Sequence, residues 1–86
     1  MVLIDEPRWA RDDDGMRFAH LVSDESLGEL DAFVARLALP RRLRFHHDHY
    51  DVPAVWWAAV VAQGATVVTT RELIRRLRRA GLRRSR

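Results

Sequence analysis

The sequence changes from a pattern typical of a strand to one typical of a helix within the stretch Thr66-Val67-Val68-Thr69-Thr70-Arg71-Glu72-Leu73-Ile74. The β-branched residues at 66–69 favour an extended strand. Thr69 and Glu72 then have the spacing of a capping box, in which the two side chains satisfy free backbone amides at a helix start. Apolar residues continue at helical spacing as far as Ala80, and Gly81 ends the pattern. The stretch therefore predicts a strand that leads directly into a helix.

A similar unit occupies the beginning of the chain. Val2-Leu3-Ile4 is a short apolar run that predicts a buried strand. Ser26 and Glu29 repeat the capping-box spacing before an apolar stripe with helical periodicity, and Pro40 is expected to end that helix. The chain therefore places a second predicted helix after a predicted strand.

The middle of the chain gives the third unit. Leu43-Arg44-Phe45 predicts a strand, and Asp51 is a candidate N-cap with Pro53 in the first turn of the helix that follows. Residues 54–63 are apolar on every side, which predicts a helix buried on two faces and ended by Gly64.

Alternating strands and helices are typical of a small α/β fold. We expect one domain over residues 1–86, with a mostly parallel sheet and three helices. The sheet has three strands, or four if the apolar segment 18–22 also pairs. Residues 83–86 are predicted to be a disordered basic tail.

Composition narrows the class of protein. The chain has 86 residues, 48% of them hydrophobic, and no cysteine, so disulfides and thiolate chemistry are excluded. The apolar run from Val52 to Ala62 is far shorter than the ~20 residues that span a bilayer. We therefore expect a cytoplasmic protein that does not insert into membranes.

Charge is unevenly distributed along the chain. All fifteen basic residues are arginine, which fits either codon bias or the use of guanidinium groups for phosphate binding. Residues 1–31 contain nine acids and three arginines, a net of 3 − 9 = −6, whereas residues 32–86 contain three acids and twelve arginines, a net of 12 − 3 = +9. This asymmetry can attract anionic partners or pair one half of the fold with the other, and an anionic small molecule is one expected partner.

The segment His46-His47-Asp48-His49-Tyr50-Asp51 contains six consecutive side chains that can bind protons or metal ions. In an extended segment, alternation puts His47, His49 and Asp51 on one side. These three, with Asp5, are the candidate ligands for a divalent metal cofactor. Two alternatives stay open: a metal-free polar site, and a purely structural role in which Asp51 caps a helix and Tyr50 packs its ring.

Other polar residues follow the ends of predicted strands. Ligands of open α/β sheets bind beyond the carboxyl ends of the strands, so residues at these positions are expected to meet at one edge. His49, Asp51 and His20 are the candidate catalytic residues, because imidazoles and carboxylates transfer protons near neutral pH. The candidate ligand-binding residues share polar or charged groups at or near this edge: Asp5, Arg8, Ser23, Asp24, Tyr50 and Arg71.

These observations indicate a polar His/Asp/Arg pocket at the carboxyl edge of the sheet that binds or hydrolyses a phosphorylated or nucleotide-like ligand. Whether the protein is an enzyme is left open. One alternative is a non-enzymatic module whose arginine-rich third predicted helix contacts nucleic acid, which we favour less because no aromatic residues lie among the arginines. Another is a homodimer formed through the helix that carries Trp56-Trp57.

Several motifs are familiar in combination. They are Asp5-Glu6-Pro7-Arg8-Trp9, His20-Leu21-Val22-Ser23-Asp24, Asp48-His49-Tyr50-Asp51-Val52-Pro53, and the pair Gln63-Gly64-Ala65 and Thr70-Arg71-Glu72-Leu73. In their order and spacing the chain resembles the family of short bacterial and phage proteins catalogued as domain of unknown function 4031. The resemblance covers nearly the whole chain. It implies a small stand-alone domain and brings no established activity, cofactor or catalytic residue.

Overall fold

Groups of strands are followed by helices along the chain in a computed structural model that describes residues 1–10 and 16–82. The strands of the described part are β1 (Val2–Ile4), β2 (Trp9–Ala10), β3 (Arg17–Ser23), β4 (Arg44–His46), β5 (His49–Pro53) and β6 (Thr66–Val67). The helices are α1 (Leu27–Ala35), the short 3-10 helix η1 (Ala54–Trp56), α2 (Trp57–Ala62) and α3 (Thr70–Arg79). The predicted α/β class and the three α-helices are confirmed, and the predicted tail at 83–86 lies outside the described residues.

The sheet is mixed, so the prediction of a mostly parallel sheet of three or four strands is wrong. Its order is β4-β5-β3-β1-β6, and β2 pairs with β3. Only the β1–β6 pair is parallel among the described strands; the other pairs are antiparallel. Parallel neighbours need a long crossover connection. The connection between β4 and β5 is far too short for one, and these strands form a hairpin.

That hairpin also overturns the predicted start of the second helix. Residues 49–53 form β5, which pairs with β3 on one side and β4 on the other, and the helical turns begin only at Ala54. Asp51 therefore lies in a central strand and does not cap a helix. Two neighbouring strands outweigh the local N-cap and proline signals, because sheet pairing satisfies the backbone groups of this segment from both sides.

Both capping boxes form their predicted N-cap bonds. The Ser26 hydroxyl accepts a hydrogen bond from the Glu29 amide, and the Thr69 hydroxyl accepts one from the Glu72 amide. Helix α3 ends before Gly81, whose φ of 76° is in the left-handed region that favours glycine. Helix α1 ends at Ala35, five residues before Pro40.

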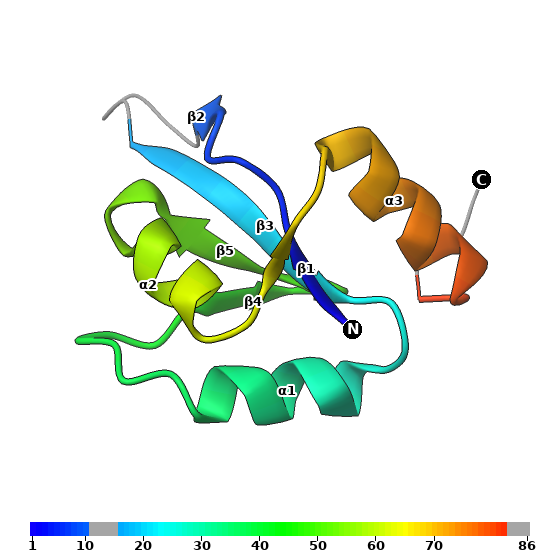
Figure 1. The fold of residues 1–86 in the computed structure, drawn as a ribbon, viewed down its shortest axis with the longest axis horizontal. Helices are drawn as coiled ribbons and strands as arrows, with labels where there is room; N and C mark the ends of the chain where they lie inside the picture. Colours follow the sequence, from blue (N-terminus) through cyan, green and yellow to red (C-terminus); the bar gives the residue numbers. More distant parts are fainter. Residues whose placement is uncertain (11–15, 83–86) are drawn as a thin grey trace.

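Helices cover both faces of the sheet, as Figure 1 shows for α1 along one side and α3 along another. The larger core lies on the face covered by α1 and α2. Its buried residues include Val2, Ile4, Ala19, Leu21, Leu30, Phe33, Val52 and Val60. The smaller core lies on the opposite face, where Leu3 and Val22 pack against Leu73 and Leu77 of α3. Because α3 is one short helix, it covers only part of its face.

The apolar segment 54–63 is not buried on two faces, contrary to the prediction. Val60 is its buried residue within α2, whereas Val55 is 81% exposed and Ala58, Ala59 and Ala62 are also exposed. One side of this segment packs against the larger core through Trp56, Trp57 and Val61. In the described part of the chain, no helix has the length and apolar character required to cross a membrane.

Candidate functional site

The face of the sheet beside α3 is polar where the helix does not cover it. Cross-strand partners share a face, so the pairs His20–Asp51, Arg44–Asp51 and His46–His49 all lie on one surface. Alternation along β3 places Val22, which packs under α3, on that same surface. We call this surface the polar face and define it by Asp5, His20, Arg44, His46, His49 and Asp51.

The sequence predicted this pocket at the carboxyl edge of the sheet, whereas the residues lie on one face of the sheet in the structure. Edge convergence follows from parallel strands, whereas β3 and β4 run antiparallel to their neighbours. Side chains that follow different strands therefore meet here by strand pairing. The expected proximity of Asp5, His20, His49 and Asp51 nevertheless holds, by a different route.

Asp5 and His20 form the most strongly constrained pair of the polar face. The Asp5 side chain is fully buried, and it accepts hydrogen bonds from the His20 backbone amide at 2.6 Å and from the Thr70 hydroxyl at 2.7 Å. The carboxylate oxygen that accepts from Thr70 also lies 2.8 Å from Nδ1 of the His20 ring. The indole of Trp57 donates to the Asp5 carbonyl oxygen at 2.8 Å, which fixes the backbone as well. Four contacts thus hold this carboxylate residue in one position.

These contacts also set the charge of Asp5. Burial alone would raise the pKa of Asp5, but the hydrogen bonds from His20 and Thr70 outweigh burial and hold that pKa below its ordinary value. A carboxylate that stays ionised accepts a hydrogen bond from the Nδ1–H group of His20. The neutral His20 ring then carries its lone pair on Nε2, which is the atom able to exchange a proton with a ligand.

His49 lies between two carboxylates. Its Nδ1 is 2.8 Å from Asp48, and its Nε2 is 3.2 Å from Asp51. Only the imidazolium form can donate from both nitrogens at once. The ring of His49 also contacts that of His20 edge to face, with centroids 5.1 Å apart. A continuous chain of contacts therefore joins Asp5, which follows β1, to His20 of β3 and to His49 and Asp51 of β5.

His46 joins this group, whereas His47 does not. The His46 ring stacks on His49 with centroids 5.7 Å apart, and its Nε2 is 3.3 Å from Asp51. His47 is exposed in the hairpin turn, where its φ is 53°. The predicted alternation of His47 with His49 fails, because a two-residue turn at 47–48 brings residues 46 and 49 opposite each other.

Four residues in or beside the polar face were not among the candidate site residues: Arg44, His46, Asp48 and Thr70. Thr70 lies at the start of α3 and donates to Asp5, and Asp48 is 7% exposed and partners His49. Both stand beside chosen residues in the sequence. A buried carboxylate such as that of Asp5 needs several hydrogen-bond donors. Thr70 carries a hydroxyl and, like Asp5, follows the carboxyl end of a predicted strand, so the sequence could have indicated Thr70 as one of these donors.

The structure places Ser23 and Asp24 at the other end of the sheet, so the expectation that they join His20 at one edge is wrong. β3 runs antiparallel to β1, so Ser23 pairs with Val2 rather than with the end of β1. Ser23 bonds to Glu29 and accepts from the amides of Glu25 and Ser26. Its contacts are those of a side chain that organises the start of α1.

Asp24 belongs to an acidic group around the chain's first residue. The amino group of Met1 lies 2.9 Å from Asp24, 2.5 Å from Glu25 and 2.8 Å from Glu29. These three acids have oxygen atoms within 4.8 Å of one another, and they are the one such group of three potential metal ligands in the described part of the chain. The Met1 amine accounts for their proximity.

The candidate metal ligands are therefore not assembled at one point. His47 is in the turn, and both oxygens of Asp5 are already hydrogen-bonded to His20 or Thr70. His49 and Asp51 do lie in contact. The arrangement of these residues is that of paired acids and imidazoles, which suits proton transfer better than coordination of a cation by all four.

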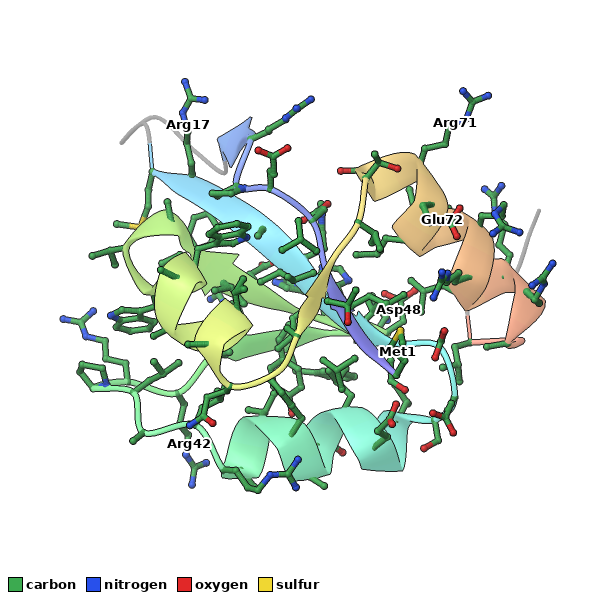
Figure 2. All side chains as sticks on the ribbon, in the orientation of Figure 1. Met1, Arg17, Arg42, Asp48, Arg71 and Glu72 are labelled. Atoms are coloured by element: carbon green, nitrogen blue, oxygen red, sulfur yellow. The ribbon has the colours of Figure 1, made fainter. Side chains whose placement is uncertain are left out.

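Three further candidates lie away from the polar face. Tyr50 is on the opposite face of β5, where its hydroxyl donates to Asp31 at 2.8 Å and its ring contacts Phe45. Arg8 is largely exposed and lies 3.4 Å from Glu6. Arg71 is exposed at the start of α3 and points away from the molecule (Figure 2).

Some residues on which the two alternative functions depend, in α3 and at Trp56-Trp57, contact other residues of the same chain. Arg75 and Arg76 of α3 both bond to Glu72, and these bonds lower the pKa of Glu72 to about 2. Trp56 and Trp57 pack against the chain's own larger core. Nucleic-acid binding by α3 and dimerisation through the Trp56-Trp57 segment stay predictions.

The fold and the polar face define a small α/β domain with a mixed sheet that carries an Asp–His cluster. The chain belongs to the family described as Protein of unknown function (DUF4031), whose family model matches residues 2–80. No curated protein and no solved structure matches the chain.

Proposed function

We propose that this protein binds a phosphorylated ligand on the polar face and hydrolyses it or transfers its phosphoryl group, with His20 as the proton-transfer residue. The Asp5–His20 pair carries the proposal. A buried, ionised acid that fixes one imidazole nitrogen is the arrangement that orients a histidine for general acid–base chemistry. The His20 side chain is 27% exposed, so a ligand can reach it.

A balanced hydrolysis follows from the arrangement of the two histidines. Nε2 of His20 takes a proton from water as the water oxygen bonds to phosphorus. The bond between phosphorus and the leaving oxygen breaks, and the imidazolium of His49 gives that oxygen a proton. The edge-to-face contact of the two rings, with centroids 5.1 Å apart, supports these paired roles, because one ligand can reach both imidazoles.

Arg44 provides a positive group at the polar face, and this group supports a phosphate as the ligand. Arg44 is opposite Asp51 in the β4–β5 register and is exposed, so its guanidinium group can form two parallel hydrogen bonds with a phosphate. Asp48 and Asp51 each lie close to an imidazole, and that imidazole offsets their repulsion of an anion when it is protonated.

The test uses p-nitrophenyl phosphate and bis(p-nitrophenyl) phosphate as substrates. We expect hydrolysis by the full chain and a loss of at least about 100-fold in kcat for His20→Asn, the scale of general acid–base catalysis. His47→Asn is the matched control, because His47 is exposed in the turn, and it should keep the activity. For the positioning residue Asp5, Asp5→Asn should lower kcat and change the pH profile while leaving KM nearly unchanged.

Binding is measured separately from chemistry. Inorganic phosphate should shift the imidazole NMR signals of His20, His46 and His49 but not that of His47. A protein that neither hydrolyses these esters above buffer nor shows phosphate-dependent shifts would contradict the proposed function. Equal activity in His20→Asn and the native chain would remove His20 from the mechanism.

A further inference from the structure

A groove of about 490 Å³ continues from the polar face toward the start of β3 and the end of β5. Asp51 and Arg44 belong to both surfaces. The groove lining combines arginines with apolar and aromatic side chains, among them Arg41, Arg42, Arg44, Phe18, Val55 and Trp56. A concave surface of this size is suited to a small molecule.

Three guanidinium groups line one part of this groove. Arg41, Arg42 and Arg44 are all exposed, and no carboxylate of the described residues lies within 4.0 Å of them to form an ion pair. In contrast, Arg75 and Arg76 on α3 are paired with Glu72. Figure 2 shows Arg42 at the surface on the long connection between α1 and β4. Clustered arginines without acidic partners create a local positive potential that favours an anion.

The other part of the groove is apolar and includes two aromatic rings. Phe18 and Trp56 are half-buried, and Phe18 is opposite Pro53 in the β3–β5 register. Val55 is 81% exposed beside them, an unusual position for a large apolar side chain. Aromatic faces stack on flat π-systems without requiring specific hydrogen bonds. This wall is suited to a planar aromatic group.

The two parts are aligned with the polar face. Phe18 and His20 are two residues apart on β3 and point to the same side, so they are separated by about 7 Å along the strand. On β5, Asp51 is opposite His20 and lies between His49 and Pro53, the residue that pairs with Phe18. A ligand with its planar end on Phe18 and Trp56 can therefore place a phosphate beside Arg44 and His20, with a sugar bridging the gap.

We infer that the phosphorylated ligand is a nucleotide, with its base against Phe18 and Trp56 and its phosphate held by Arg42 and Arg44. This inference rests on the proposed function and names its substrate class. A sugar phosphate would make no contact with the apolar part of the groove, and an uncharged aromatic compound would make no charge-assisted hydrogen bond with the arginines. A nucleotide satisfies both parts of the groove.

The experiment is isothermal titration calorimetry of the full chain at low salt with three probes: adenosine 5′-monophosphate, adenosine and ribose 5-phosphate. We expect the nucleotide to bind at least about tenfold more tightly than either fragment. Arg42→Gln combined with Arg44→Gln should weaken nucleotide binding by at least about tenfold. Arg78→Gln, an exposed arginine on α3, is the matched control and should leave it unchanged.

Two variants test the aromatic wall. Trp56→Leu should reduce nucleotide affinity to that of ribose 5-phosphate. Because Trp56 also packs against the core, Val55→Asp is the second variant, which adds a carboxylate to the groove at an exposed position. This substitution should lower the affinity for the nucleotide at least about fivefold without changing the unfolding midpoint.

The outcomes separate the two proposals. Equal affinities for ribose 5-phosphate and the nucleotide would overturn the nucleotide inference and leave phosphate binding in place. Equal affinities for adenosine and the nucleotide would overturn the role of the arginines. If neither phosphorylated probe binds, both the inference and the proposed function fail.

Discussion

The carboxylate of Asp5 contacts His20 twice, accepting a hydrogen bond from the backbone amide at 2.6 Å and lying 2.8 Å from ring Nδ1. Because the side chain of Asp5 is fully buried, this pair couples the stability of the fold to the orientation of a candidate catalytic imidazole. Changes at Asp5 should therefore affect both properties together.

Asp5→Asn should lower the free energy of unfolding by about 1–3 kcal/mol, because the amide cannot accept from all three donors and leaves a buried group unsatisfied. The measurement is the urea midpoint near pH 7. Glu6→Gln is the matched control: Glu6 is the exposed neighbouring acid, and its substitution should change stability by less than about 0.5 kcal/mol. Equal effects of the two substitutions would show that the Asp5 contacts do not stabilise the fold.

The stability of the protein should depend on pH through Asp5 in a definite direction. Its pKa in the folded protein is lower than the ordinary value of 3.8, so the unfolded chain binds more protons in acid. The contribution of Asp5 is fully present above pH 3.8 and is lost as the pH falls through the lower folded pKa. Asp24 and Glu29 have lowered pKa values as well and act in the same direction.

The pH effect is isolated by comparing the native chain with Asp5→Asn. The difference between their melting temperatures should be largest near pH 7 and should shrink toward pH 2. A difference that is independent of pH would contradict the role of the ionised carboxylate. The acids around Met1 are common to both chains, so their contributions cancel in the difference.

Thr70→Val should remove one hydrogen bond to Asp5 while keeping the shape of the side chain. Hydrogen bonds to charged groups contribute about 1.5–3 kcal/mol, and we expect a loss near the lower end of that range. Thr70→Ser, which keeps the hydroxyl, is the control and should retain most of the stability. Urea unfolding of the two variants measures the difference, and a Ser variant as unstable as the Val variant would assign the effect to the methyl group.

His47→Gly tests the hairpin turn. His47 has a φ of 53°, a conformation that costs a residue with a side chain roughly 1 kcal/mol and costs glycine almost nothing. Part of this gain is offset by the greater freedom of glycine in the unfolded chain, so we expect a rise in stability of up to about 0.5 kcal/mol. His47→Val should be clearly destabilising, as measured by thermal unfolding. A more stable Val variant would contradict the turn geometry.

The sequence alone determined the parts of the structure that depend on neighbouring residues. Capping signals at Ser26 and Thr69 define the starts of two helices, because a helix N-terminus is satisfied by groups three residues away. The apolar runs at 2–4 and 18–22 are strands for the same local reason, and the spacing of Leu73 and Leu77 identified the buried side of α3. Local chemistry was also sufficient to single out His20, His49, Asp51 and Asp5.

Only the tertiary structure decided how those residues meet. The direction of each strand depends on pairing between segments far apart in the chain, so the sequence could not show that β3 runs against β1 and carries Ser23 and Asp24 away from Asp5. The same pairing made a strand of residues 49–53, where local signals favoured a helix start, because neighbours on both sides satisfy its backbone. Strand pairing placed His20 beside His49, and the packing of α3 brought Thr70 to Asp5.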